Sequence, residues 1–443
     1  MAVKIGMVSL GCPKNQVDAE VMLDKLKKAG YEITNDSSLA EVIIINTCGF
    51  IEAAKSEAIE NIIESARFKA DGTLRALIVT GCLAERYRDE ISNEIPEVDV
   101  VVGIGKNADI ANIVAETLNG KCQNHYAEKS ELVLEGDRVL TTPPYTAYLK
   151  IAEGCDNCCT FCAIPLIRGH FRSRSMESVL LEAEKLAKQG VTELVLVAQD
   201  TTRYGEDING GESLLPTLLN EISKIDGIRW IRTLYTYPER ITDQLLSVLK
   251  DNEKVVPYLD IPLQHANGDI LKSMNRKGNS ESLKALIGHI REVVPNITLR
   301  TTMLVGFPGE TEAQFEELCE FVSDMKFDRL GCFAYSEEED TPAAEFANQV
   351  DPQVRQDRAD NVMELQLSVV EEKMQQKIGT KTTVLIEGYD NYIRCYYGRS
   401  ECDAPEIDGK IFFISDRPLK IGDYVNVAIN DTIDYDLLGE LEG

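Results

Sequence analysis

Three closely spaced cysteines carry the strongest chemical signal in the sequence. Cys155, Cys159 and Cys162 lie in the segment GCDNCCTFC, separated by three and then two residues. Three thiolates in one short loop can hold three irons of a 4Fe–4S cluster and leave the fourth iron open for a cofactor or substrate. The alternative is a structural zinc site, because Cys155/Cys158 and Cys159/Cys162 are also two C-x-x-C pairs. These pairs abut without an intervening loop, which favours the cluster and leaves Cys158 as a spare cysteine.

A second set of cysteines is dispersed along the first part of the chain. Cys12, Cys48 and Cys82 each follow a predicted strand and adjoin a glycine, and their separations of 36 and 34 residues match one βα unit each. The carboxyl ends of parallel strands meet at one sheet edge, where ligands bind in doubly wound folds. The alternative is ordinary buried cysteines at strand ends. We favour a second three-cysteine iron–sulfur cluster, again with one open iron.

Other candidate binding residues follow predicted strands further along the chain. They are Gln199, Asp200, Gln264, Gly306, Pro308 and Gly309. Glycines in such a position let the backbone approach an adenine or a ribose closely. The alternative for the glycine-containing segment is a plain turn between a strand and a helix.

Three arginines follow the first cysteine loop in the segment RGHFRSR. In a chain with a net charge of −28, Arg168, Arg172 and Arg174 stand out, and they can hold a substrate carboxylate or phosphate. The alternative is solvated arginines that balance nearby acids.

Two series of apolar runs and helical patterns must position these residues. Residues 1–135 alternate unbroken β-branched runs with helical segments, which predicts a doubly wound parallel α/β domain. Residues 136–373 hold six further βα units and end in a long helix over Pro352–Lys377. Six units fit a β/α barrel that is incomplete against the full count of eight. Residues 374–443 show short strands with turn residues between them, which predicts a small antiparallel β-barrel.

Composition narrows the class of protein. The 443 residues are 44% hydrophobic and 27% charged, with 46 Lys and Arg against 74 Asp and Glu. This strong negative charge argues against broad nucleic-acid binding. The sequence shows no signal peptide and no long apolar stretch, so we expect a cytoplasmic protein without membrane contact. In that reducing compartment, twelve cysteines indicate metal binding or catalysis rather than disulfides.

The cysteine pattern and the domain order together resemble one family, the radical S-adenosylmethionine (SAM) methylthiotransferases. The likeness covers essentially the whole chain and rests on several specific segments. They are SLGCPKN (Ser9–Asn15), NTCGFI (Asn46–Ile51), VTGC (Val79–Cys82), EGCDNCCTFCAIP (Glu153–Pro165), AQDTTRYG (Ala198–Gly205), YLDIPLQHA (Tyr258–Ala266), GFPGET (Gly306–Thr311) and DAPEIDG (Asp403–Gly409). Within the family, the chain is similar to enzymes that methylthiolate an aspartate of small-subunit ribosomal protein S-twelve, free or in the subunit.

The resemblance implies two 4Fe–4S clusters and SAM as cofactors. The cluster on Cys155, Cys159 and Cys162 would bind SAM at its open iron and, once reduced, yield a 5′-deoxyadenosyl radical. The auxiliary cluster on Cys12, Cys48 and Cys82 would carry the sulfur, which a first SAM methylates. The radical would take hydrogen from the β-carbon of the aspartate, which then collects the methylthio group. The terminal barrel, which resembles a TRAM domain, would grip the substrate, and a flavodoxin or ferredoxin would supply electrons.

Two alternatives differ in substrate or in class. A tRNA (adenosine) methylthiotransferase would share both clusters, but residues 374–443 hold 7 Lys and Arg against 13 Asp and Glu, whereas an RNA-binding barrel should be basic. The tRNA-modifying relatives usually have an arginine in a Tyr-Ser-x-Arg segment, where this chain reads Tyr335-Ser336-Glu337-Glu338-Glu339-Asp340. The third hypothesis, a non-catalytic iron–sulfur RNA-binding adaptor, differs in that it would not cleave SAM.

Overall fold

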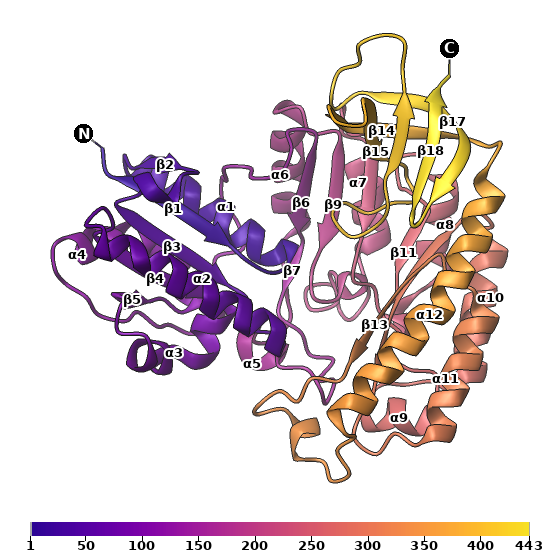
Figure 1. The fold of residues 1–443 in the computed structure, drawn as a ribbon, viewed down its shortest axis with the longest axis horizontal. Helices are drawn as coiled ribbons and strands as arrows, with labels where there is room; N and C mark the ends of the chain where they lie inside the picture. The colour runs from indigo at the N-terminus through magenta and orange to yellow at the C-terminus, as the bar shows by residue number, and fades with distance from the viewer. Residues whose placement is uncertain (1, 443) are drawn as a thin grey trace.

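The computed structural model describes residues 2–442 as three parts that follow one another along the chain (Figure 1). An α/β domain comes first, a wall of parallel strands backed by helices comes second, and a small β-barrel closes the chain. No helix in this described range is both long and apolar enough to cross a membrane.

The first domain is built on a parallel sheet with the strand order β2-β1-β3-β4-β5. The strands are β1 (Lys4–Ser9), β2 (Glu32–Thr34), β3 (Val42–Thr47), β4 (Ala76–Gly81) and β5 (Val100–Val101). The helices are α1 (Pro13–Lys28), α2 (Glu52–Ala70), α3 (Cys82–Glu94) and α4 (Ile110–Leu118). Alternate strand residues pack against α1 and α4 on one face and against α2 and α3 on the other. The predicted doubly wound architecture is confirmed.

The central part holds six parallel strands. They form two three-stranded sheets with the strand orders β6-β9-β10 and β11-β12-β13. Their bounds are β6 (Thr146–Lys150), β9 (Glu193–Val197), β10 (Trp230–Thr233), β11 (Tyr258–Asp260), β12 (Thr298–Val305) and β13 (Arg329–Ala334). A short antiparallel pair, β7 (Ala152–Glu153) and β8 (Arg172–Ser173), brackets the cysteine loop. This agrees with the predicted incomplete barrel.

Helices cover the outer side of this strand wall (Figure 1). They are α6 (Met176–Lys188), α7 (Leu215–Ser223), α8 (Asp243–Asp251), α10 (Ser280–Val293), α11 (Glu312–Met325) and α12 (Pro352–Lys377). The short helix α5 (Ile164–Arg168) lies instead against α3 of the first domain, and α9 (Gly268–Ser273) follows β11. Outward strand residues such as Leu149 and Leu196 join the helices in the largest core of the molecule. Inward residues such as Tyr148 and Trp230 form a separate core on the concave side.

The C-terminal strands close into a barrel in the order β14-β15-β16-β18-β17. They are β14 (Lys381–Asp390), β15 (Cys395–Arg399), β16 (Ile411–Ile414), β17 (Tyr424–Ile433) and β18 (Asp436–Leu441). The sequence predicts four of these strands, over Thr380–Glu387, Tyr392–Gly398, Lys410–Ser415 and Tyr424–Asn430. The fifth, β18, lacks a β-branched run but pairs with both β16 and β17 and so completes the closure.

The loop between β15 and β16 fills the concave side of the strand wall. Ala404 is buried in the concave core, and the Asp408 carboxylate accepts a hydrogen bond of 2.7 Å from the Tyr258 hydroxyl. The Asp403 carboxylate pairs with Arg329 at 2.6 Å. Tyr258 and Arg329 stand at the first residues of β11 and β13, so this plug loop, residues 400–408, occupies the amino-terminal end of the wall. The barrel that we expect to bind the substrate is thus also anchored to the strand wall by this loop.

A buried ion pair fixes the same two parts together and gives a prediction about acid stability. Glu193 pairs with Arg399 at 2.7 Å and with Arg232 at 3.4 Å. Burial alone would raise the pKa of Glu193, but these two guanidiniums lower it to about 2 from the ordinary 4.5. A carboxyl whose folded pKa is lowered stabilises the fold above its unfolded pKa, and that stabilisation is lost as the pH falls from about 4.5 toward 2.

We therefore expect Glu193→Gln to destabilise the chain by about 3–5 kcal/mol at pH 7, because two buried cations lose their partner. The exposed Glu212→Gln variant is the control, and urea unfolding at pH 7 and pH 3.5 is the measurement. The difference between Glu193→Gln and the wild type should shrink at the lower pH. An equal difference at both pH values would contradict the assigned ion pair.

Candidate functional site

The three-cysteine loop lies at the carboxyl end of the first wall strands. Cys155, Cys159 and Cys162 are half-buried, whereas Cys158 is exposed and has a left-handed backbone with φ of +49°. Burial raises the pKa of Cys155 to about 11, and it also raises that of Cys162, which nearby Cys159 increases further. A metal centre at this loop would have to take the three thiols as thiolates, with release of their protons.

Hydrogen bonds from neighbouring loops hold the cysteine loop in shape. The Cys155 N–H donates to the Gly169 carbonyl at 3.1 Å, and Asn275 donates to the Cys158 carbonyl at 3.0 Å. The side chain of Asn157 donates to Asp200 at 2.9 Å. The Arg276 guanidinium lies 3.6 Å from the Cys159 sulfur, and the Tyr237 hydroxyl lies 3.8 Å from it. The thiols are therefore presented by a fixed backbone.

The second set of cysteines meets at one edge of the first sheet, as expected. Cys12, Cys48 and Cys82 follow β1, β3 and β4, which are adjacent and parallel. A Cβ on Gly11 would lie only 2.9 Å from the Cys48 sulfur, so the chain closes tightly around it. Burial raises the pKa of Cys82 to about 12; the nearby Arg168 guanidinium opposes this rise and the other two thiols add to it.

The two sets of cysteines lie on opposite sides of one domain interface. Cys82 packs against Ala163 and Ile167, which follow Cys162 in the chain. Within residues 2–442, no three His, Cys, Asp or Glu side chains close around a single metal ion. A 4Fe–4S cluster is much larger than one ion, and three thiols with no fourth protein ligand are the donor set that leaves one iron open. Both sets fit this group by their chemistry.

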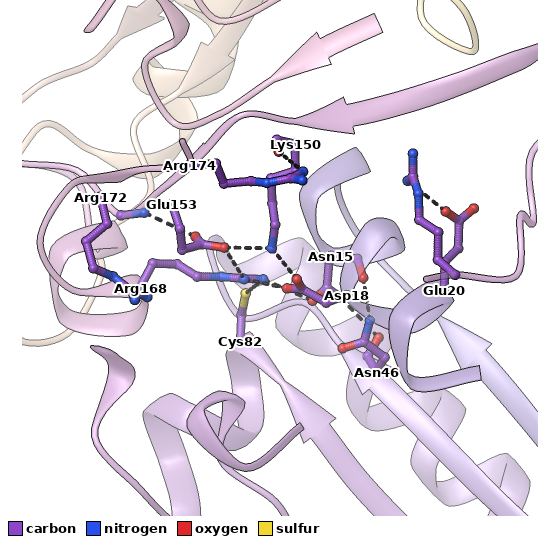
Figure 2. Close-up of polar contacts among 12 residues, drawn as sticks. Asn15, Asp18, Glu20, Asn46, Cys82, Lys150, Glu153, Arg168, Arg172 and Arg174 are labelled. Carbon is purple, nitrogen blue, oxygen red and sulfur yellow. Dashed lines mark hydrogen bonds and ion pairs between the residues drawn. The ribbon is translucent and has the colours of Figure 1, made fainter. Parts of the chain in front are cut away.

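A buried ion network joins the two domains between the cysteine sets (Figure 2). Arg168 on α5 pairs with Asp18 on α1 at 2.6 Å and with Glu153 at 3.2 Å, while its other nitrogen lies 3.4 Å from the Cys82 sulfur. Lys150 also pairs with Asp18 and, at 3.0 Å, with Glu153. Burial alone would raise the pKa of Glu153, but Lys150 and Arg168 lower it to about 2. These charges bind one domain to the other.

The three candidate arginines have partners within the protein. Arg174 is buried and pairs with Glu182 at 2.5 Å. Arg172 donates to the carbonyls of Lys129 and Ser130 at 3.1 and 2.7 Å. Together with the ion pairs of Arg168, these contacts explain the cluster as an anchor of the loop and of the interface.

The other candidate residues lie near the carboxyl ends of the strands but differ in how their polar atoms are used. Gln199 donates to Glu153 at 2.7 Å, and its buried carbonyl oxygen has no hydrogen-bond partner in the described range. Asp200 accepts from Asn157, Thr202 and Arg240. Gln264 has φ of +73° and pairs through its backbone with β12.

The glycine-containing turn packs against the long helix. A Cβ on Gly306 would lie 2.4 Å from Arg355 on α12, and the Gly306 N–H donates to Glu310 at 2.9 Å. Pro308 is buried, and the Gly309 N–H donates to the Asn348 carbonyl at 2.9 Å. Glycine at position 306 is thus required by close packing against α12.

The acidic segment after β13 contacts the first domain. Glu338 pairs with Arg86 at 2.7 Å and with Lys55 at 3.3 Å, and the Glu339 carboxylate accepts from Tyr87 at 2.9 Å. This second contact holds α2 and α3 against the strand wall. The residue types alone did not indicate this contact between the domains, because Arg86 and Glu338 are about 250 residues apart in the chain.

Sequence reasoning also missed Asp18, Lys150 and Glu153 as interface residues. It likewise missed Lys14 with Tyr235 under its ammonium group, and Tyr237 beside Cys159. Lys14 lies in SLGCPKN and Glu153 directly precedes the cysteine loop, so adjacency to a cysteine motif was the available signal.

Comparison with family models defines the class of the protein. Residues 4–103 match the Uncharacterized protein family UPF0004, residues 149–322 match the Radical SAM superfamily, and residues 378–441 match the TRAM domain. The chain is therefore a radical SAM enzyme with an amino-terminal α/β domain and a terminal TRAM barrel.

Close relatives identify the family within this class. The chain is 49% identical to a protein of Desulforamulus reducens over 99% of both chains, and 49% identical to one of Thermoanaerobacter sp. over 98% of this chain and 99% of the relative. Both are named "Ribosomal protein uS12 methylthiotransferase RimO", uS12 being ribosomal protein S-twelve. The chain belongs to the RimO family of radical SAM methylthiotransferases.

Solved structures support the fold at low sequence identity. The radical SAM methyltransferase TsrM from Kitasatospora setae, solved with cobalamin and a [4Fe-4S] cluster, has a TM-score of 0.56 at 15% identity over 77% of each chain. The cobalamin-dependent radical SAM enzyme OxsB has a TM-score of 0.50 at 12% identity over 84% of this chain and 56% of its own. These likenesses concern the fold alone.

Proposed function

We propose that this chain transfers a methylthio group to the β-carbon of an aspartate of uS12. The observation that carries the proposal is the pair of three-cysteine sets on the two sides of one buried interface, where Arg168 lies beside Cys82. The names of the close relatives supply the substrate. The C–H bond at the β-carbon is unactivated and cannot be broken by an acid or a base, so a cofactor radical has to take the hydrogen.

The family's cofactors, two 4Fe–4S clusters and SAM, supply radical formation and the sulfur that is transferred when they are bound. In our proposal, Cys155, Cys159 and Cys162 hold one cluster and Cys12, Cys48 and Cys82 hold the other. The buried pairs of Arg168 and Lys150 exclude water from the interface between them. The Arg276 and Tyr237 groups orient the Cys159 thiolate.

SAM itself is proposed to bind along the carboxyl ends of the wall strands. The unpartnered Gln199 carbonyl can accept a hydrogen bond from the cofactor's amino group. Gln264 and the turn at Gly306, Pro308 and Gly309 would border the adenosine. Asp200 would act through Asn157, whose backbone carries the cysteine loop.

We propose the electron donor and the substrate from the chemistry that each must have. A reductant of the flavodoxin or ferredoxin type would feed the clusters. The acidic TRAM barrel suits a basic ribosomal protein better than tRNA. The relatives named above carry the ribosomal-protein name, which does not favour the tRNA alternative or the adaptor.

The test is an anaerobic assay that offers both substrate classes together. The reconstituted protein receives reductant, sulfide and SAM, with free uS12, small ribosomal subunits and bulk tRNA, and mass spectrometry locates any added methylthio group. We expect the gain on an aspartate of uS12, and we expect Cys159→Ala and Cys48→Ala each to abolish it.

The matched control is Cys122→Ala, since Cys122 is exposed and lies at neither site. Its activity should equal that of the wild type. A gain on tRNA would reject the proposed substrate. Full activity in Cys48→Ala would reject the auxiliary ligand set.

A further inference from the structure

Lys14 is a buried cation with no acidic partner. It is the second residue of α1, two positions after Cys12, and only 7% of it is exposed. Within residues 2–442 its ammonium group forms no ion pair and no hydrogen bond. It lies instead over the ring of Tyr235, 3.4 Å from the centroid. A buried ammonium without a counter-charge is costly, so such a group usually meets an anion when the protein works.

The surrounding charges leave the positive charge uncompensated. The ion network beside Lys14 holds two cations, Lys150 and Arg168, and two carboxylates, Asp18 and Glu153, while Glu20, further along α1, is paired with Arg138 at 3.0 Å. Both carboxylates are already paired with Lys150 and Arg168. The first turn of α1 holds no acidic residue, and its positive dipole end adds to the charge of Lys14. The ammonium group of Lys14 is therefore one positive charge in excess at this buried interface.

Two tyrosines connect the surroundings of Lys14 with the radical-cluster site. Tyr235 and Tyr237 follow β10 and are two residues apart in the chain. The Tyr237 hydroxyl reaches the Cys159 sulfur of the radical-cluster site, whereas Tyr235 lies under Lys14 beside Cys12. Tyr235 has a left-handed φ of +59°, and its N–H is held by the Asp260 carboxylate at 3.0 Å. Backbone strain of this kind costs on the order of 1–3 kcal/mol and is typical of functional sites.

We propose that Lys14 binds the side-chain carboxylate of the substrate aspartate and thereby selects aspartate as the target. This inference rests on the proposed function and adds a substrate-binding residue to it. A charge-assisted bond from Lys14 would hold the carboxylate on the auxiliary-cluster side of the domain interface, with the adjacent β-carbon turned toward the radical site. Tyr235 would keep the ammonium in place through its ring.

The competing role for Lys14 is to balance the charge of the auxiliary cluster through Cys12. The two roles differ in what they predict for the substrate. A carboxylate-binding lysine makes the wild type prefer aspartate over asparagine at the target position, and its removal erases that preference. A charge-balancing lysine changes the potential of the cluster and leaves the preference as it was.

The experiment is a two-by-two comparison of enzyme and substrate. Reconstituted wild type and Lys14→Gln each receive uS12 that carries either aspartate or asparagine at the target position. The uS12 is supplied as free protein or in the small subunit, whichever of the two the wild type modifies. Methylthio product, 5′-deoxyadenosine and equilibrium binding without SAM are measured. We expect the wild type to prefer aspartate by about 100-fold in kcat/KM, and Lys14→Gln to reduce this preference to about threefold.

Two further variants and one spectrum complete the test. Lys14→Arg keeps the charge and should recover part of the preference, whereas Lys27→Gln removes an exposed charge from the same helix and should change nothing. The iron content of Lys14→Gln and the intensity of its EPR signal should match the wild type, which shows that both clusters are present. A retained preference in Lys14→Gln, with or without a shifted potential, overturns the inference. Absence of methylthio transfer by the wild type overturns the proposed function instead.

Discussion

Replacing Gly154 with alanine is expected to remove the radical cluster and leave the auxiliary site able to hold its own. Gly154 has φ of +77°, and a Cβ there would lie 2.1 Å from the His170 carbonyl oxygen and 2.6 Å from that of Gly169. Both contacts are with backbone, so the loop itself must shift. The Gly169 carbonyl also accepts the N–H of Cys155, and the shift therefore displaces a ligand. Iron should fall to about half, and 5′-deoxyadenosine formation should be lost.

The reciprocal variant is Gly81→Ala. Gly81 precedes Cys82 with φ of +95°, and a Cβ would lie 2.4 Å from the Thr47 carbonyl oxygen on the neighbouring strand. We expect loss of the auxiliary cluster with SAM cleavage retained and no methylthio product. Gly72→Ala is the matched control, because Gly72 has φ of +76° but nothing within 4 Å of its Cβ position. Equal losses of both clusters in the two variants would contradict the separation of the sites.

The second large effect is expected for Arg168→Met. Methionine fills a similar volume but leaves Asp18 and Glu153 with Lys150 as their only cation. Breaking a buried network of this kind costs about 3–5 kcal/mol. Chemical unfolding of the protein without clusters should show this loss. Small-angle scattering should then detect separation of the first domain from the strand wall.

Arg168 also donates toward the Cys82 sulfur, which gives a second readout in the reconstituted protein. A hydrogen bond and a positive charge at a ligand sulfur favour the reduced cluster. Their removal should lower the midpoint potential of the auxiliary cluster and leave that of the radical cluster unchanged. Arg172→Met is the control, because Arg172 contacts only two carbonyls. Identical stability and potential in the two variants would refute the bridging role.

The sequence predicted the parts of this molecule that follow from local pattern. Strands β3 and β4 are unbroken apolar runs buried on both faces, and β1 is a partly buried run beside them. Such runs separated by helical segments predicted the parallel strands. The meeting of Cys12, Cys48 and Cys82 at one sheet edge then followed from the strands, because parallel strands bring their carboxyl ends together. Helix α12 was predicted with its observed bounds, since Pro352 begins it and Gly379 follows it.

What the sequence did not show depends on contacts between distant segments. Arg168 meets Asp18 across 150 residues, so the local cluster of arginines did not show that Arg168 and Arg174 are buried in protein contacts. The edge strand β2 is only three residues long and half-exposed, which gives it no apolar run. The burial of Lys14 follows from the docking of α1 on the wall, and no pattern within α1 encodes it.

The plug loop has a consequence for how far a substrate must extend. It locks the TRAM barrel into the amino-terminal end of the strand wall, while both sets of cysteines lie toward the carboxyl ends. The barrel therefore cannot swing toward the reacting atoms. If the barrel binds uS12, as proposed, its position is fixed. The target aspartate must then lie at a fixed distance from the surface of uS12 that the barrel binds. Short peptides that carry the aspartate alone would then lack the second point of attachment.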